Sequence, residues 1–379
     1  MKLEAWEREP LWLKLLTPYL KKKRFPRLEG TPEISRWVRL YADGCVTANG
    51  EEVYADFQLG SENKLLLFFL GGGVSWNAYT AARPVSVYEK NLREGFYIIH
   101  TDLFTDINLS KGIFEDCEKN PFRGWSKLVL PYNTGDFHCG AGDFPYVAKD
   151  GTERLCHHHG YLNYRRAIET VKGVVPTPDA LVVSGCSGGG FGAALLTDDV
   201  MSIYPDCGNV TCLVDSAFIP MESWHEVAEK VWKTPNEIAA RIHSDNITLD
   251  ALEALHRDRG SRVKILLCAS ERDAALVRMT NYIRHSCFDF SKESGVEFNY
   301  WLHGMMAQVQ QTIPQAGIYI FHIPDSSHRK MGLTRHCLIG DRELYTYQVD
   351  GVSAAEWIKH ALCGEIRSCG LAQLEDRHG

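Results

Sequence analysis

Residues 181–192 read LVVSGCSGGGFG, an apolar run that ends in glycines around a single serine. The segment GCSGG at 185–189 fits the pattern G-x-S-x-G, with Ser187 at its centre. An apolar run typical of a buried strand leads into the pattern, and a helical pattern, FGAALLTDDVMSIY, leads out of it. A serine nucleophile on a sharp strand-to-helix turn needs this context, because only small neighbours fit around the turn. We interpret Ser187 as a candidate nucleophile, with a plain glycine-rich turn as the alternative.

Short apolar runs recur on both sides of this stretch, and each ends in glycine or polar residues. Runs of this kind are typical of strands in a sheet that is covered on both faces. Helical patterns such as GYLNYRRAIETVKGV lie between several of them. The alternation predicts an α/β fold with a mostly parallel central sheet. The expected strands are EEVYADFQLG, KLLLFFLGGG, GFYIIHTD, KLVLPYNTGD, DALVVSGCSGGG, VTCLVDS, VKILLCASERD and GIYIFHIPDSSH.

The 379 residues show no Pro- or Gly-rich linker, so we expect a single domain over residues 1–379. One segment, residues 221–259, is long and helical in pattern and lies between two expected strands. Its length predicts a helical cap over one end of the sheet, with an ordinary crossover as the alternative.

The composition narrows the class of protein and of partner. Hydrophobic residues make up 45% of the chain, charged residues 23%, and the formal charge is −7, which argues against nucleic acid as a partner. No apolar run reaches the roughly 20 residues that span a bilayer, and the start lacks the apolar core of a secretory signal. We therefore expect a soluble cytoplasmic protein with mostly reduced cysteines, or a secreted one if a leader has been removed.

A serine nucleophile needs a base and an acid, and in such folds they follow the serine in the order acid, then histidine. The loop after VKILLCA offers Glu271 and Asp273, and the loop after GIYIFHI offers Asp325 and His328. We predict a triad in which His328 takes the proton of the serine and Asp273 orients the imidazole. Glu271 remains open as the acid.

An oxyanion hole is expected from the glycines at 71–73, which follow the early strand KLLLFFL. Amides of Gly72, Gly73 and Val74 would join the amide of Gly188 in stabilising a developing negative charge. Such chemistry requires no cofactor.

Four blocks of the sequence also resemble a known family: FLGGG, PYNTGDFHCGAGD, HGYLNYRRAI and SGCSGGGFGA. They are similar to blocks of the pectin acetylesterase/Notum family of α/β-hydrolase serine esterases, and the resemblance runs from about residue 60 to 331. It implies the α/β-hydrolase fold, helices on both faces of the sheet, and the triad roles given above. It also places Asp136 and His138 near the active site.

The resemblance further implies a substrate. Members of this family remove small acyl groups: acetyl from pectin in plants, and a fatty acyl group from a secreted signalling protein in animals. Asn133 stands where the family has a cysteine, and Val74-Ser75-Trp76 follows the glycines where it has a Trp-Cys pair. With no export signal in the sequence, we expect a small-molecule ester, first an acetylated sugar, rather than polymeric pectin.

Three other hypotheses stay open at this point. A lipid or thioester deacylase would use the same triad, and a binding protein would retain the fold without catalysis. A zinc hydrolase would use Cys156 and the histidines 157–159, with His138-Cys139 upstream. These residues lack the C-x2-C or H-x3-H spacing, and adjacent histidines at a helix start point in different directions, so we expect no metal.

One aromatic residue is a candidate for substrate binding. Trp76 follows the glycine loop and is expected either to stack on a sugar ring or to pack in the rim of the core. The oligomeric state is left open.

Overall fold

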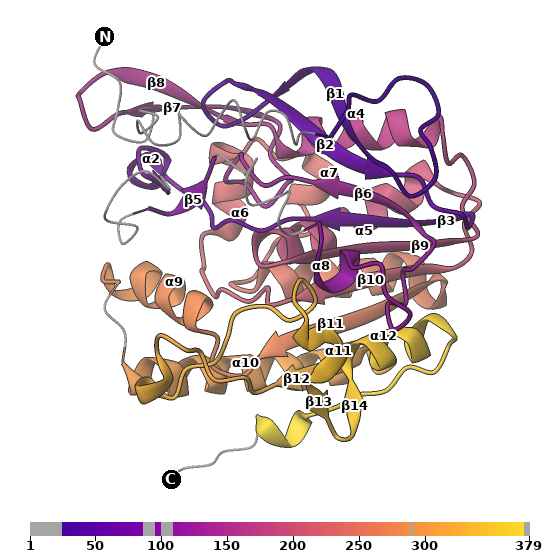
Figure 1. The fold of residues 1–379 in the computed structure, drawn as a ribbon. Coiled ribbons are helices and arrows are strands. Elements are labelled where there is room, and N and C mark those ends of the chain that lie inside the picture. The colour runs from indigo at the N-terminus through magenta and orange to yellow at the C-terminus, as the bar shows by residue number, and fades with distance from the viewer. Residues whose placement is uncertain (1–24, 86–94, 100–108, 289–290, 375–379) are drawn as a thin grey trace.

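The computed structural model describes residues 25–85, 95–99, 109–288 and 291–374. Its main feature is an eight-stranded sheet in the order β1-β2-β6-β3-β9-β10-β11-β12, which runs through the molecule from the indigo to the gold part of the chain (Figure 1). The strands are β1 Trp37–Val46, β2 Glu52–Gln58, β3 Lys64–Phe69, β6 Ser126–Leu130, β9 Ala180–Cys186, β10 Val210–Asp215, β11 Val263–Ser270 and β12 Gly317–Phe321.

The sheet is mostly parallel, as the sequence predicts. Strands β6, β3, β9, β10, β11 and β12 pair in parallel, while β2 is antiparallel to both β1 and β6. β3 lies between β6 and β9 in the middle of the sheet. The next strand of the sheet, β6, is added on one side of β3, and β9 to β12 are added on the other side. The carboxyl ends of β3 and β9 therefore lie side by side, at the kind of crevice where α/β sheets bind ligands.

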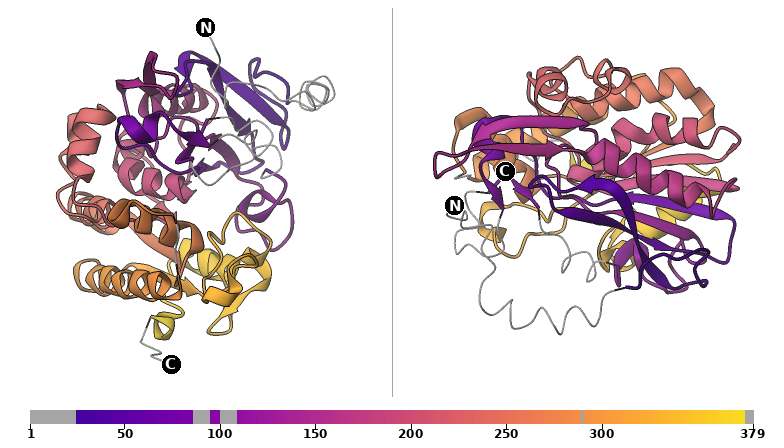
Figure 2. Two further views of the ribbon diagram at one scale, coloured as in Figure 1. Left: turned by 90° about the vertical axis from the view of Figure 1, so that its left-hand side faces the viewer. Right: turned by 90° about the horizontal axis from the view of Figure 1, so that it is seen from above.

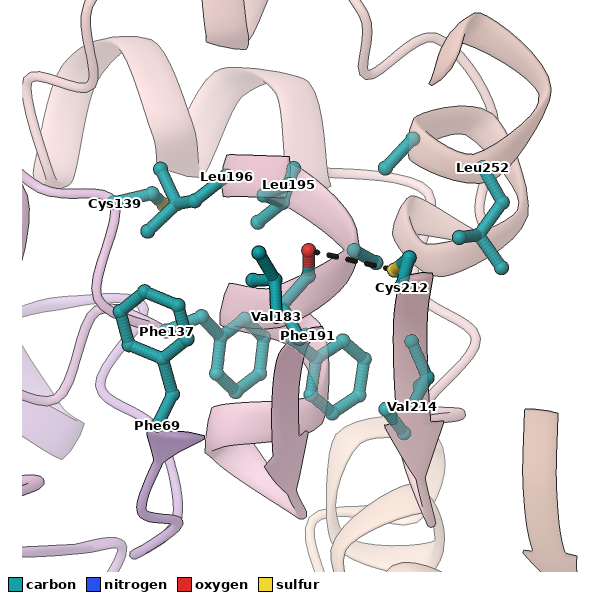
Figure 3. Close-up of a cluster of buried hydrophobic side chains, with 14 of the residues drawn as sticks. Phe69, Phe137, Cys139, Val183, Phe191, Leu195, Leu196, Cys212, Val214 and Leu252 are labelled. Carbon is teal, nitrogen blue, oxygen red and sulfur yellow. Dashed lines mark hydrogen bonds between the residues drawn. The ribbon is translucent and has the colours of Figure 1, made fainter. Parts of the chain in front are cut away.

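Four helices cover one face of the sheet: α4 Gly160–Lys172, α5 Gly188–Ile203, α8 Ile247–Arg259 and α10 Lys292–Thr312. Figure 2 shows the helices along one side of the molecule. In the core beneath α5, the rings of Phe137 and Phe191 stack with centroids 4.0 Å apart, close to Val183 of β9 and Val214 of β10 (Figure 3). Alternate residues of the strands face the other side, where α12 Ala354–Leu362 packs with Trp357 fully buried.

Shorter elements lie around the sheet, and two of them differ from the sequence-based expectation. GFYIIHTD contributes only the short strand β5 Tyr97–Ile98, which pairs with β4 Pro84–Val85 outside the main sheet; its last residues, from 100, lie outside the described part of the chain. The segment CHHH, expected at a helix start, belongs mostly to strand β8 Glu153–His158, which forms an antiparallel hairpin with β7 Gly142–Val147. The other short elements are α2 Ala78–Ala81, η3 Gly112–Phe114, η5 Gly260–Arg262, α9 Ala274–His285, η6 Arg329–Met331, α11 Glu343–Thr346, β13 Gln348–Val349, β14 Val352–Ser353 and η7 Leu371–Gln373.

The segment 221–259 has two parts. Its second part is α8, which packs against α5 and β11 and is thus a crossover helix of the layer on the sheet. Its first part contains α6 Trp224–Glu226, the π-helical turn η4 Val227–Val231 and α7 Asn236–Ala239. Trp224 and Trp232 are fully buried against Phe137, and the Trp232 indole donates to the carbonyl of Ser75 at 2.6 Å. α8 is therefore a crossover helix and not a cap. The first part of the segment packs beside the carboxyl end of the sheet.

No helix in the described part of the chain combines the length and the apolar character that spanning a bilayer requires.

The close contact between β3 and the start of α5 predicts a strong effect of one methyl group. A Cβ atom at Gly189 would lie 1.9 Å from the carbonyl oxygen of Phe69, so Gly189→Ala forces the backbone apart. We expect the free energy of unfolding to fall by about 3 kcal/mol or more in urea titrations followed by circular dichroism. Gly304→Ala is the matched control, because Gly304 is exposed within α10 with no atom near the added methyl. It should gain about 0.5–1 kcal/mol from helix propensity, and equal losses in both variants would contradict the packing argument.

Candidate active site

Ser187 lies on a strained turn between β9 and α5. Its φ of 55° and ψ of −128° place a non-glycine residue in a region that only a tight surrounding structure maintains. The N–H of Ser187 donates to the carbonyl of Asp215, at the end of the neighbouring strand, at 2.9 Å. A Cβ atom at Gly185 would lie 2.1 Å from the carbonyl oxygen of Gly189, so glycine is required where the turn closes on itself. The turn exposes the serine side chain at the carboxyl edge of the sheet.

The glycine loop at 71–73 lies directly against this turn. A Cβ atom at Gly71 would lie 2.5 Å from the Cβ of Ser187, and one at Gly188 would lie 3.2 Å from the carbonyl oxygen of Gly73. Gly188 is the first residue of α5, so its N–H has no acceptor within the helix. The N–H groups of Gly72 and Gly73 also have no acceptor among the described residues. The glycine loop and the first residue of α5 thus lie next to the serine turn.

Val74 does not belong to this set. Its N–H donates to the carbonyl of Phe96 at 2.8 Å, and the N–H of Ile98 donates to the carbonyl of Gly72 at 2.7 Å. The expectation that the Val74 amide faces the substrate is therefore wrong, because short-strand pairing with the segment around Tyr97 uses it. The hydroxyl of the buried Tyr132 donates to the carbonyl of Gly73 at 2.7 Å and helps to fix the loop.

Asp273 is fully buried at the start of α9 and pairs with a histidine that the sequence analysis did not select. Its Oδ1 accepts the N–H groups of Ala275 and Leu276, both at 3.0 Å, as an N-cap does. Its Oδ2 lies 2.7 Å from Nδ1 of His336. Because the first oxygen is held by the helix, the second is fixed in direction toward the imidazole.

His328 takes a different partner. Its Nδ1 lies 2.8 Å from Oδ1 of Asp325, three residues earlier in the same loop. The predicted pairing of Asp273 with His328 is therefore wrong. His328 pairs with Asp325 within one turn of the same loop, and Asp273 pairs with His336 further along the chain. Glu271 is likewise engaged elsewhere, since its Oε1 lies 2.6 Å from Nδ1 of His322.

A pocket of about 430 Å³ brings these parts together. Ser187, Gly188, His336 and the glycines at 71–73 all line it. The rest of the wall is mostly apolar and includes Val85, Phe96, Ile98, Ile219, Met279 and Phe288. No residue of the segment 221–259 is among those that line it. The site is thus an apolar pocket with a serine, a histidine and free amides in its wall.

Two cysteines flank the reactive groups in the same wall. Cys186 precedes the serine and Cys337 follows the histidine, and both thiols line the pocket. A hydrogen bond from Cys337 lowers the pKa of Cys186, whereas burial raises the pKa of Cys337 well above its ordinary value.

Three other predicted site residues lie behind the wall rather than in it. Asp136 is fully buried and accepts from the Thr134 hydroxyl at 2.6 Å and from the backbone N–H of Gly160 at 2.8 Å. His138 is buried with its Nε2 2.8 Å from the carbonyl of Leu70, and burial lowers its pKa to about 4, so the ring is neutral. Trp76 packs edge-on against Phe96, with ring centroids 5.2 Å apart. Of the three, His138 contacts the residue that follows β3, and none of the three is among the residues that line the pocket.

The Cys/His residues of the alternative zinc-hydrolase hypothesis do not come together as a whole. Cys139 and His138 are buried near Asp136, while Cys156 is buried against the hydroxyl of Tyr97 at 3.7 Å. The alternation of a strand separates the three histidines, since His158 points inward to the carbonyl of Thr134 at 2.8 Å. None of these side chains lines the serine pocket.

The fold and the site define an α/β protein that carries a serine on a strained turn at the carboxyl edge of a mostly parallel sheet. The sequence matches the family model described as pectinacetylesterase over residues 54–250, just over half of the chain. The chain therefore belongs to the pectinacetylesterase family, and it is a carboxylic ester hydrolase of the acetylesterase kind. The family resemblance in the sequence is thereby confirmed. A search among curated proteins gives no match.

The contact with Asp273 predicts an unusual titration of His336. Burial by itself lowers the pKa of this imidazole, but the charge of Asp273 and its hydrogen bond outweigh burial and raise the pKa to about 9. The proton is therefore bound more tightly in the folded chain than in the unfolded one, where a pKa of about 6.5 is typical. The resulting stabilisation is complete below about pH 6.5 and is lost as the pH rises through 9.

NMR titration of the histidine ring signals checks this pKa. Asp273→Asn should lower the pKa of His336 by more than one unit, because the amide keeps a polar contact but not the charge. Asp325→Asn is the control and should leave His336 unchanged. A wild-type pKa at or below 6.5 would contradict the argument.

Proposed function

We propose that this esterase has the α/β-hydrolase fold and acts through a triad of Ser187, His336 and Asp273. The observation that carries the proposal is the bond from the buried Asp273 to His336, in the wall of the pocket that also contains the serine. The serine turn between a parallel strand and a helix supports the fold assignment. The order of the three residues along the chain, serine then aspartate then histidine, is the order of that fold.

In the proposed reaction, the hydroxyl oxygen of Ser187 attacks the carbonyl carbon of the ester. The neutral form of His336, which predominates only above its pKa of about 9, takes the hydroxyl proton at Nε2. Asp273 at Nδ1 holds the ring in the required tautomer and stabilises the charge that then forms on it. The amides of Gly72, Gly73 and Gly188 donate hydrogen bonds to the carbonyl oxygen and stabilise the negative charge that develops on it. The imidazolium then protonates the departing alcohol, and the same imidazole activates water to release the acid from Ser187.

Three substitutions test the triad. We expect Ser187→Ala and His336→Ala each to lower kcat for p-nitrophenyl acetate by about 10⁴-fold or more, since triad members act as a unit. His328→Ala is the matched control, a histidine paired with an aspartate in the same connection, and it should stay within about threefold of wild type. Circular dichroism verifies that each variant is folded.

Three outcomes would overturn the assignment. Full activity in Ser187→Ala would exclude the serine mechanism, and failure of a fluorophosphonate to label the wild type would point to a binding protein. Loss of activity in His328→Ala with retention in His336→Ala would return the base to the residue first predicted from the sequence.

As the first substrate class we propose acetyl esters of carbohydrates, small molecules rather than polymeric pectin. The family to which the chain belongs supports acetyl as the acyl group. The sugar is a proposal that stands on the family description alone, because the lining of the pocket has few polar side chains apart from Ser187, Arg278 and His336.

A second candidate function is the deacylation of longer acyl chains, and the pocket itself favours it. A volume of about 430 Å³ is in the range that encloses a drug-sized ligand, far more than the two carbons of an acetyl group. The wall contributes apolar side chains from several segments, among them Val85, the segment around Phe96, Ile219, α9 and Phe288. Each methylene buried there is worth about 0.8 kcal/mol.

A series of p-nitrophenyl esters from C2 to C12 separates the two functions. If the pocket takes the acyl chain, kcat/KM should rise at least tenfold from C2 to C8, as methylenes leave water for the apolar wall. Met279→Trp, which narrows the pocket, should then reduce turnover of C8 while sparing C2. An optimum at C2 with no response to Met279→Trp would favour the acetylesterase and exclude the longer chains.

A further inference from the structure

A group of three side chains on the β7–β8 hairpin lies outside the active-site pocket. Asp143 of β7 stands directly opposite His157 of β8 in the antiparallel ladder, and His159 follows two residues later. Oδ1 of Asp143 lies 2.7 Å from Nδ1 of His157 and 2.9 Å from Nε2 of His159. The three ligand atoms lie within 4.8 Å of one another.

The strand explains why these two histidines meet. Side chains two residues apart in a strand point to the same face, whereas the residue between them points to the opposite face. His158 accordingly turns inward to the carbonyl of Thr134, while His157 and His159 present their rings outward with centroids 5.4 Å apart. Because β8 ends at His158 and α4 starts from His159, the H-x-H spacing at this strand end places two rings together, as H-x3-H does on a helix.

We propose that Asp143, His157 and His159 form a binding site for one divalent transition-metal ion, of which zinc is the type. Two imidazole nitrogens and one carboxylate oxygen are the donor set that such an ion prefers. Bonds of about 2.0–2.2 Å to a tetrahedral ion place its ligand atoms roughly 3.3 Å apart. The observed separations of 2.7 and 2.9 Å are those of hydrogen bonds. The ion replaces the shared protons once the carboxylate oxygen and the two ring nitrogens move apart by about half an ångström.

Solvent access and the hydrogen bonds of the ligand side chains determine how tightly this site binds an ion. The side chains of Asp143, His157 and His159 are 43%, 25% and 19% exposed, so an ion reaches them from solvent and keeps water in its remaining position. Nδ1 of His159 is buried without a hydrogen-bond partner in the described structure. A metal-bound imidazole ordinarily donates from its other nitrogen, and the lack of an acceptor weakens binding about 10- to 100-fold. The site therefore binds in the micromolar rather than the nanomolar range.

The position of the site assigns it a structural effect. Asp143 is the second residue of β7, and His159 is the residue from which α4 starts. An ion bound to Asp143 and His159 therefore links the end of the β7–β8 hairpin to the start of α4. None of the three ligands lines the serine pocket, so ester hydrolysis proceeds without the ion.

Titration of the purified full-length chain with zinc chloride in a calorimeter is the first test, after removal of metal by chelation. We expect one ion per chain with a dissociation constant of roughly 1–10 µM, and a rise of the melting temperature of about 2 °C at saturating zinc. His157→Ala and Asp143→Asn should each weaken binding at least tenfold. Asp143→Asn retains an oxygen acceptor for the histidines, so a loss of binding in this folded variant is attributable to the missing charge.

His225→Ala is the matched control, because His225 also lies beside a carboxylate, at 3.3 Å from Glu229 on an exposed helix turn, and should bind zinc like wild type. Cobalt(II) replaces zinc to identify the donor atoms, since the described chain holds twelve free cysteines. Weak visible bands without a thiolate charge-transfer band support the site. A thiolate band, an unchanged affinity in His157→Ala and Asp143→Asn, or no binding below 1 mM would overturn it.

Discussion

Asp215, at the end of β10, holds together the two halves of the candidate active site. Its carbonyl oxygen accepts the N–H of Ser187, which fixes the turn that carries the serine. Its carboxylate is fully buried and accepts the N–H groups of Leu338 and Ile339 at 2.7 and 2.9 Å, which fixes the loop that carries His336. Burial raises the pKa of this carboxyl. A single residue of the central sheet therefore contacts both the turn that carries the serine and the loop that carries the histidine.

The glycines act on the same junction from the other side. The carbonyl of Phe69 at the end of β3 touches Gly189 so closely that no side chain fits, and Gly71 does the same against Ser187. This contact brings the free amides at 72 and 73 to the serine, and it depends on β3 and β9 being neighbours in the sheet. The strain at Ser187 is thus maintained by packing that extends from the sheet to α5.

The sequence predicts the parts of this arrangement that depend on local pattern. Buried parallel strands read as continuous apolar runs, so most of the central sheet, Ser187 and the loop that offers Glu271 and Asp273 follow from the order of runs and the polar residues after them. The histidine does not follow, because both His328 and His336 come after the last strand and satisfy the order serine, acid, histidine. Tertiary contacts distinguish the two histidines. Thr334 forms a β-bridge with Asp273, and the carboxylate of Asp215 accepts the N–H of Leu338, two residues after His336. Contacts to distant strands determine where this loop lies, and the periodicity of apolar residues in the sequence does not indicate those contacts.

The same distinction accounts for the histidines of the hairpin. On a helix, neighbouring histidines diverge and the run CHHH places no two rings together; on a strand, the first and third share a face and the second is buried. The secondary structure thus decides whether H-x-H forms a pair of ligands. The strand residues before CHHH are only ERL, a run too short to distinguish the two-residue period of a strand from the 3.6-residue period of a helix. The partner Asp143 is fixed only by the register of β7 against β8. A site made by cross-strand register becomes visible once the pairing is known, whereas a site made by a strand-to-helix turn, such as that of Ser187, is visible in the sequence itself.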